Sequence, residues 1–281
     1  MLRFAGIEAK YANKETAKVF LQPIPYDGTS TWGKGADRAF EAFMEAAQNM
    51  ELYDIETDSE PYLVGIYTEP PLVIAGTPKD VFNAVYTRTR QILNSGKFPT
   101  FLGGEHSISI GIIKAFYEYY KDLSVLHLDA HADLRKEYQG TPYNHACAMH
   151  DASKHTNLVQ VGIRSMDKCE KQFLNRNKTF FACDIFDSNN WFEEVLELLT
   201  DTVYITIDLD VFAPGLIPAT GTPEPGGLSW FQVLKLLKLV FEHKNVVGFD
   251  IVELAPMPYL LHPQFTAAKL YYKMLAYKFF L

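Results

Sequence analysis

Residues 123–133 read Leu-Ser-Val-Leu-His-Leu-Asp-Ala-His-Ala-Asp, an apolar, strand-like run that ends in two aspartates and a histidine. A second such run, from Val203 to Ile207, leads into Thr-Ile-Asp-Leu-Asp at 206–210. Strands of almost continuous apolar character are typical of a parallel sheet covered on both faces, and polar residues at their carboxyl ends face a crevice. We therefore predict an α/β fold with a site where these strands end.

The second stretch predicts a divalent-metal site. Because side chains alternate along a strand, Asp208 and Asp210 point to the same side. Two carboxylates held together repel each other unless a cation lies between them. An isolated Asp-x-Asp is more often a solvated turn or a helix cap, but apolar and β-branched residues precede this pair and a loop rich in proline and glycine follows it. We interpret the two aspartates as metal ligands.

A third cluster, Gly-Gly-Glu-His-Ser at 103–107, follows the apolar run 98–102 and looks like a glycine turn that starts a helix. The three clusters together supply two imidazoles and four carboxylates. This set suits hard or borderline ions such as Mn²⁺, and it contains no thiolate that would favour zinc. Six ligands are too many for one catalytic ion and suit two ions about 3.5–4 Å apart. The candidate ligands are His106, Asp129, His131, Asp133, Asp208 and Asp210.

Strand-like and helix-like segments alternate along the chain, as expected for a mostly parallel sheet. No linker or shift in composition divides the sequence, so we expect a single domain over residues 1–281. We predict strands at 18–24, 98–102, 124–128, 158–162, 203–207 and 246–251, and helices at 39–48, 81–94, 108–120, 230–243 and 266–280.

Composition excludes several classes of protein. The net charge of −8, without a basic stripe, speaks against nucleic acid as a partner. Cys147, Cys169 and Cys183 form no CxxC pair, so neither a disulfide framework nor a thiolate metal site is predicted. The sequence shows no secretory signal and no apolar run of about 18 residues, which predicts no membrane segment. We expect a cytoplasmic protein.

Five blocks, in order along the chain, resemble the ureohydrolases, the superfamily of arginase, agmatinase and formimidoylglutamase. The blocks are Pro-Tyr-Asp-Gly-Thr-Ser (25–30), Gly-Gly-Glu-His (103–106), Asp-Ala-His-Ala-Asp (129–133), Asp-Leu-Asp (208–210) with Gly-Thr-Pro-Glu-Pro-Gly-Gly (221–227), and Phe-Asp-Ile-Val-Glu-Leu-Ala-Pro (249–256). The resemblance implies a three-layer α/β/α domain with a central, mostly parallel sheet. It also implies two Mn²⁺ ions, a small cationic guanidino substrate that is split into urea and an amine, and a homo-oligomer, either a trimer or a hexamer.

The same resemblance implies how the ligands are shared between the two ions. One ion would be held by His106, Asp129, Asp133 and Asp208, and the other by His131, Asp129, Asp208 and Asp210. Asp129 and Asp208 would therefore bridge. The joint charge of two ions lowers the pKa of a bridging water, which supplies hydroxide to attack the guanidinium carbon.

Further roles follow from the resemblance. His145 would carry the proton to the leaving amine, although a loop imidazole without a role is the alternative. Glu253 would pair with the guanidinium, although it could also be a capping or salt-bridging carboxylate. Asp133 counts among the catalytic residues as well as the ligands. We expect further substrate contacts from Glu137, Tyr143 and Asn144. His127 lies outside the ligand pattern and is interpreted as a packed histidine beside the metal site.

Departures from the family pattern concern the substrate. Ala213, Ala219 and Ala146 stand where many members have aspartate or glycine, and the loop 134–143 lacks the Ser-Gly-Asn run typical of arginases. Agmatinase-type members resemble the chain most, so we predict agmatine or aminopropylagmatine as the substrate. Arginase, guanidinobutyrase or formimidoylglutamase specificity remains an alternative. More distant alternatives are a dimetal phosphoesterase and a noncatalytic metal-binding protein.

Overall fold

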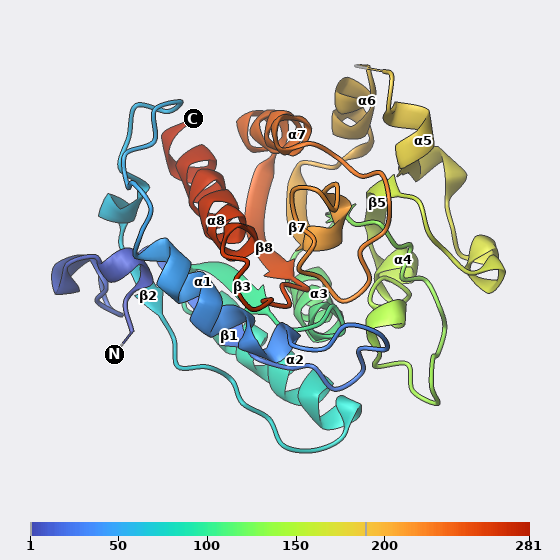
Figure 1. Cartoon of the computed structure of the whole chain (residues 1–281), viewed down its shortest axis with the longest axis horizontal. Coiled ribbons are helices and arrows are strands. Elements are labelled where there is room, and N and C mark those ends of the chain that lie inside the picture. The colour runs from blue at the N-terminus through green and yellow to red at the C-terminus, as the bar shows by residue number, and fades with distance from the viewer. Residues whose placement is uncertain (1, 189) are drawn as a thin grey trace.

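The computed structural model describes residues 2–188 and 190–281, and within them eight strands form one sheet in the order β2-β1-β3-β8-β7-β4-β5-β6 (Figure 1). Every neighbouring pair of strands is parallel. The strands are β1 (Val19–Ile24), β2 (Ile66–Thr68), β3 (Phe98–Gly103), β4 (Leu123–Leu128), β5 (Asn157–Ile163), β6 (Thr179–Phe181), β7 (Thr202–Asp208) and β8 (Asn245–Val252).

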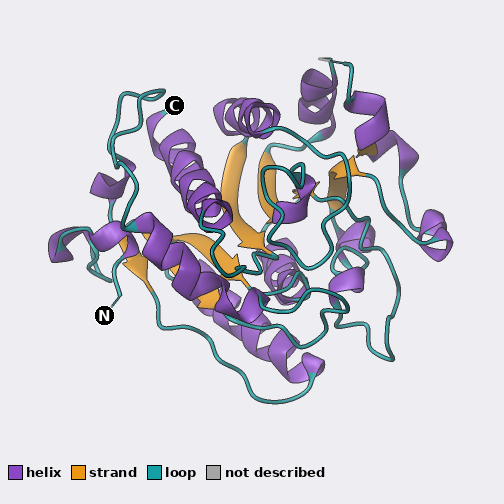
Figure 2. Cartoon of the chain, viewed as in Figure 1, coloured by secondary structure: helices purple, strands orange, loops and turns teal. Residues whose placement is uncertain are grey.

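Helices cover both faces of the sheet, which confirms the predicted three-layer α/β/α architecture (Figure 2). One layer contains α1 (Ala39–Ala47), α5 (Ala182–Ile185), α6 (Trp191–Leu198), α7 (Trp230–His243) and α8 (His262–Phe280). The other layer contains α2 (Pro78–Asn94), α3 (Ile108–Tyr119) and α4 (Ala152–His155).

Alternation along the central strands divides the core between these two layers. In β7, Val203, Ile205 and Ile207 pack towards the layer with α7 and α8, whereas Tyr204 packs towards the layer with α2 and α3. All of these side chains are buried, because a parallel sheet covered on both faces has no side open to water. The near-continuous apolar runs in the sequence are explained by this double burial.

Helix starts follow local capping chemistry. The hydroxyl of Thr77 accepts a hydrogen bond from the N–H of Asp80, and the Asp80 carboxylate accepts one from the N–H of Thr77. This capping box starts α2 at Pro78, three residues before the predicted start at Val81. Ser229 and Gln232 form the same arrangement at the start of α7, where prediction and structure agree.

The elements that the sequence did not predict are short or lie at the sheet edges. β2 and β6 are the two edge strands and contain three residues each, too few to show an alternation pattern. α4, α5 and α6 contain at most eight residues. Among the described residues, no helix has the length and apolar character needed to cross a membrane.

The central four strands set the position of the predicted site. β3, β8, β7 and β4 are neighbours in the sheet, and their register aligns Leu102 with Ile251, Ile251 with Ile207, and Ile207 with Leu128. The carboxyl ends of the four strands are therefore nearly aligned along the edge of the sheet. The residues that follow face one crevice at the carboxyl edge, as expected for an open parallel sheet.

Candidate active site

Four loops converge at this carboxyl edge. Gly104 and Glu105 connect β3 to His106, Asp129 follows β4, Asp208 is the last residue of β7, and Glu253 follows β8. The sequence clusters that were predicted to form a metal site are thus brought together by the register of neighbouring strands.

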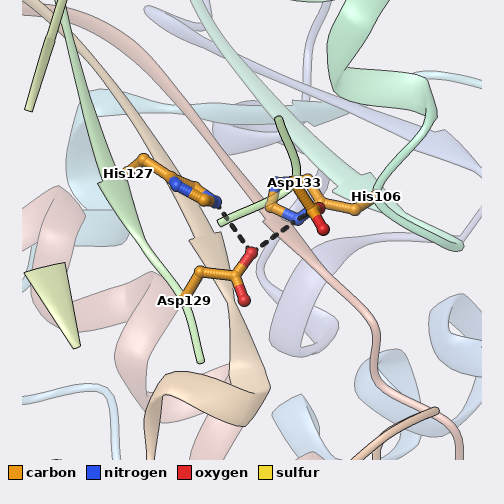
Figure 3. A group of neighbouring side chains, drawn as sticks. All are labelled: His106, His127, Asp129 and Asp133. Carbon is orange, nitrogen blue, oxygen red and sulfur yellow. Dashed lines mark hydrogen bonds and ion pairs between the residues drawn. The ribbon is translucent and has the colours of Figure 1, made fainter. Parts of the chain in front are cut away.

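Three carboxylates surround the ring of His106. Its Nδ1 atom lies 3.1 Å from Asp129 Oδ2, 3.3 Å from Asp133 Oδ2 and 3.4 Å from Asp208 Oδ2. Figure 3 shows His106, Asp129 and Asp133 pointing toward one another. Nδ1 is buried and makes no hydrogen bond with good geometry to the described residues. An imidazole nitrogen and three carboxylate oxygens directed at one point are suitable ligands for a divalent cation.

A second group of ligands adjoins the first. His131 Nδ1 lies 2.9 Å from Asp210 Oδ2 and 3.6 Å from Asp129 Oδ1. Asp129 therefore directs one carboxylate oxygen to each histidine, Oδ2 to His106 and Oδ1 to His131. This arrangement is the one that a carboxylate bridging two cations needs.

The ring of His106 is oriented by hydroxyl and carboxylate partners. Thr206 donates its hydroxyl hydrogen to Asp250 Oδ1 at 2.6 Å, and Thr206 Oγ1 lies 2.9 Å from His106 Nε2. Since that hydroxyl hydrogen is used on Asp250, Nε2 carries a hydrogen and donates it to Thr206. Nδ1 is left with its lone pair directed at the carboxylates, as a metal ligand requires. Asp250 was not predicted as a site residue, although its apolar strand setting resembles that of Asp208.

The hydrogen-bond partners of His127 also select one tautomer of its ring. Gln160 donates one amide hydrogen to His127 Nδ1 at 3.0 Å and the other to the carbonyl of Ala132 at 2.9 Å. His127 Nε2 therefore carries a hydrogen and donates it to Asp129 Oδ2 at 2.7 Å, the contact drawn in Figure 3. His127 supports Asp129, in keeping with the interpretation as a packed histidine beside the site.

The electrostatics of the cluster match a site built for cations. Burial, followed by the negative charges of Asp210 and Asp129, raises the pKa of Asp208 well above its usual range. Burial and the charge of Asp129 also raise the pKa of Asp210. Divalent cations among these carboxylates would offset this repulsion. The residues present therefore fit a metal centre.

A pocket of about 170 Å³ opens onto the cluster. His131, Asp133 and Asp208 line it, whereas His106, Asp129 and Asp210 lie buried beneath. The cations would therefore be held from below and remain reachable from the pocket. His145 and Glu253 line the same pocket, so the structure places the predicted proton carrier and the predicted guanidinium partner beside the candidate ligands.

Glu253 lies at a position with an unusual backbone conformation. It has a φ of +66° and Asp133 has a φ of +53°, a left-handed backbone that residues other than glycine rarely adopt. Such strain often occurs at functional sites. Glu253 Oε1 accepts a hydrogen bond from the N–H of His106 at 2.7 Å. Burial, followed by the charge of Glu105, raises the pKa of Glu253 well above its usual range, and a guanidinium placed against it would favour the carboxylate.

Three predicted substrate contacts lie outside the lining of this pocket. Glu137 is exposed to solvent, Tyr143 packs against Phe82 with ring centroids 4.6 Å apart, and Asn144 is buried. Their contact with substrate stays a prediction that this geometry does not support. Ala146, one of the departures from the family pattern, does line the pocket.

Several residues that line the same pocket were not predicted from the sequence. They are Trp32, Tyr138, Ser165, Met166, Asp167 and Glu170. Ser165, Met166 and Asp167 follow the buried strand β5, so the same signal that identified Asp129 and Asp208, polar residues after an apolar run, would have found Asp167.

Comparisons with known proteins agree with this geometry. The model of the arginase family matches residues 17–276. The chain is 35% identical to an N(1)-aminopropylagmatine ureohydrolase of Synechocystis, over 93% of this chain and 89% of that protein. It is 38% identical to an N(1)-aminopropylagmatine ureohydrolase of Thermus thermophilus, over 96% of this chain and 93% of the relative. The crystal structure of the agmatine ureohydrolase of Thermoplasma volcanium superposes with a TM-score of 0.87 at 30% identity, covering 99% of this chain and 94% of that one.

Proposed function

The chain belongs to the arginase family, and from that premise we propose that it is a dimanganese amidinohydrolase acting on agmatine or aminopropylagmatine. The products would be urea and an amine, which is putrescine from agmatine or spermidine from aminopropylagmatine. The reaction class, hydrolysis of a guanidino group, is that of the family. The identity of the metal and of the substrate are our proposals.

One observation carries the proposal. Asp129 directs its two carboxylate oxygens to two different histidines, and the pocket above this cluster also exposes Glu253 and His145. A ligand set of two imidazoles and four carboxylates is the oxygen-rich kind that Mn²⁺ accepts. The arginine that lines the pocket, Arg135, lies 3.5 Å from Asp167 and is paired with it, so it does not offer a free clamp for a phosphate.

The residues that line the pocket have separate roles in the proposed reaction. When bound, two divalent cations lower the pKa of a water and supply a nucleophile near neutral pH. Glu253 presents a carboxylate to the planar guanidinium and would orient it by paired N–H contacts. His145 moves the proton that the leaving amine needs. In the overall balance a guanidinium and a water give urea and a protonated amine, so no proton is gained or lost.

The character of the pocket favours a cationic tail. Asp133, Asp167, Glu170 and Glu253 line it, while Arg135 is engaged with Asp167. Curated relatives at 35% and 38% identity carry the name N(1)-aminopropylagmatine ureohydrolase, and other relatives carry the name agmatinase. Both names describe guanidino compounds with an amine at the far end, which supports the proposed substrate class.

A urea-release assay tests the proposed function directly. The full chain is incubated with Mn²⁺ and, separately, with agmatine, aminopropylagmatine, arginine and guanidinobutyrate, for which urea is measured, and with formimidoylglutamate, for which formamide is measured. We expect urea from the first two compounds. Absence of urea from every guanidino compound, with metal bound, would refute the proposal. Absence of formamide as well would favour a phosphoesterase or a metal-binding protein without turnover.

We further propose that the enzyme is cytoplasmic and forms a homo-oligomer, a trimer or a hexamer. The three cysteines are free of disulfides in the structure, in agreement with a reducing compartment. Light scattering of the purified protein is expected to give a mass that is three or six times the chain mass of 31.9 kDa. A particle with the mass of one chain, at micromolar concentration, would contradict this expectation.

A further inference from the structure

Glu105 is a fully buried carboxylate that belongs neither to the metal ligands nor to the pocket lining. Within residues 2–188 and 190–281 it forms no ion pair with a lysine or an arginine. It accepts instead from the N–H and the hydroxyl of Thr29, both at 2.7 Å, from the hydroxyl of Ser30 at 3.2 Å, and from the hydroxyl of Ser107. A buried carboxyl group whose partners are all neutral donors calls for a functional explanation.

Thr29 and Ser30 belong to a loop that packs closely against the end of β3. The N–H of Glu105 donates to the carbonyl of Tyr26 at 2.8 Å. A Cβ atom at Gly104 would lie 2.0 Å from that carbonyl oxygen, so only glycine allows the loop with Thr29 to approach so closely. Thr29, which is 6% exposed, is therefore fixed in place between Glu105 and the loop that carries His145.

Thr29 links Glu105 to His145. Its Oγ1 atom lies 2.7 Å from Glu105 Oε1, 3.1 Å from the backbone nitrogen of His145 and 3.2 Å from His145 Nδ1. A hydroxyl has one hydrogen to donate and two lone pairs. The shortest contact of the hydroxyl is the one to Glu105 Oε1, so the hydrogen of Thr29 is donated there. Thr29 Oγ1 must then accept from the backbone N–H of His145 and from its Nδ1. This places a hydrogen on Nδ1 and leaves Nε2 with a lone pair.

We propose that Glu105 and Thr29 are positioning residues that fix the tautomer of His145 for proton transfer. The inference deepens the proposed function and rests on it, because His145 lines the pocket beside Asp208 and Glu253. With Nδ1–H held by Thr29, His145 Nε2 accepts a proton from the attacking water as the C–O bond forms. It returns that proton to the substrate's alkyl nitrogen as the C–N bond breaks, and the second proton of the water passes from the oxygen of the nascent urea to the departing amine. The ring ends neutral, in its starting tautomer, while urea and the protonated amine leave.

Loss of the Thr29 hydroxyl removes the acceptor that selects this tautomer. The neutral ring can then carry its hydrogen on Nε2, the atom that has to accept the proton. In this state the ring can still pack in its loop, so the defect should appear in turnover rather than in substrate binding. Thr29→Ser keeps the hydroxyl and should keep the tautomer, whereas Thr29→Val has a similar shape and lacks it.

The first test measures the tautomer directly. Heteronuclear NMR of the histidine ring nitrogens is recorded on the full chain with Mg²⁺, a diamagnetic ion, and the His145 signals are assigned by their loss in His145→Asn. We expect the Nδ1–H form in the wild type and in Thr29→Ser, and a shift toward the Nε2–H form in Thr29→Val. An Nε2–H form in the wild type would overturn the proposal without any variant being needed.

The second test measures turnover of agmatine with Mn²⁺. We expect kcat of Thr29→Val to fall about 10–100-fold, less than the roughly 10²–10⁴-fold that general acid–base catalysis contributes because His145 itself is retained, with KM changed less than about 3-fold. Thr29→Ser and the matched control Thr87→Val, at an exposed position of α2, should stay within about 3-fold of the wild type. Equal losses in the Ser and Val variants would contradict the relay.

The two measurements separate the failure of this inference from the failure of the proposed function. If no guanidino compound is hydrolysed but the tautomer follows Thr29 as expected, the proposed reaction is wrong and the positioning of His145 stands. If urea is released but the tautomer or the kcat of Thr29→Val is unchanged, the reaction stands and the relay is wrong. Melting curves of the three variants show whether a loss in kcat reflects unfolding.

Discussion

Asp129→Ala is expected to lower kcat/KM at least about 10³-fold, which corresponds to ~4 kcal/mol of transition-state stabilisation. The reason is that Asp129 directs one oxygen to His106 and the other to His131, so its removal weakens both halves of the metal centre. His127 would also lose the carboxylate to which it donates at 2.7 Å. Urea release at saturating Mn²⁺, together with the metal content of the dialysed protein, measures the effect.

His106→Ala is the informative comparison, because His106 faces only one of the two ligand groups. We expect a smaller loss for it, about 10–100-fold, and a loss for Asp208→Ala closer to that of Asp129→Ala. Asp201→Ala, at an exposed position before β7, serves as the matched control and should behave as the wild type. Equal losses of metal and turnover in all three ligand variants would remove the support for bridging.

Removal of metal by a chelator tests the dependence of activity on the metal centre without a mutation. Wild-type protein stripped of metal should lose its activity and regain it when Mn²⁺ is added, and its melting temperature should rise on addition because the bound ion stabilises the folded state. Asp129→Ala should show neither recovery nor a comparable rise. Full activity in thoroughly stripped enzyme would refute the metal mechanism itself.

The central sheet and the cluster of candidate metal ligands could be predicted from the sequence because each rests on local signals. Runs such as Val203–Ile207 are apolar since both faces of the sheet are covered, and Asp208 and Asp210 directly follow such a run. The edge strands β2 and β6 could not be predicted, because three residues carry no periodic signal.

The rest of the site depends on distances that only the fold supplies. Thr29 and His145 are 116 positions apart, and Thr206 and Asp250 are 44 apart, yet the two members of each pair are within hydrogen-bonding distance of each other. Glu137 illustrates the opposite error. It follows Asp133 closely in sequence, but its side chain is exposed and outside the pocket, whereas Asp167, from the loop after β5, lines it.

Substrate choice is expected to favour agmatine or aminopropylagmatine over arginine by at least about 10²-fold in kcat/KM, or about 2.7 kcal/mol. In the proposed mechanism the guanidino end of every candidate would be held at the candidate ligands and Glu253, so discrimination would depend on the far end. The pocket lining contains more carboxylates than cations, since Asp167 and Glu170 line it together with Asp133, whereas its arginine, Arg135, is paired with Asp167 and lies over the ring of Tyr138. The carboxylate of arginine would meet like charges, whereas an amine would meet opposite charges.

Two variants test which acidic residue contacts the amine at the far end of the substrate. Asp167→Asn is expected to raise KM for agmatine about 10-fold while changing kcat little, because the tail is remote from the bonds that change. Glu137→Gln tests the assignment made from the sequence, and a rise in its KM instead would return the tail contact to the loop 134–143. Preference of the wild type for arginine or for an acidic-tailed substrate would refute the specificity. The metal mechanism would be untouched, since the ligands and Glu253 act only on the end that all these substrates share.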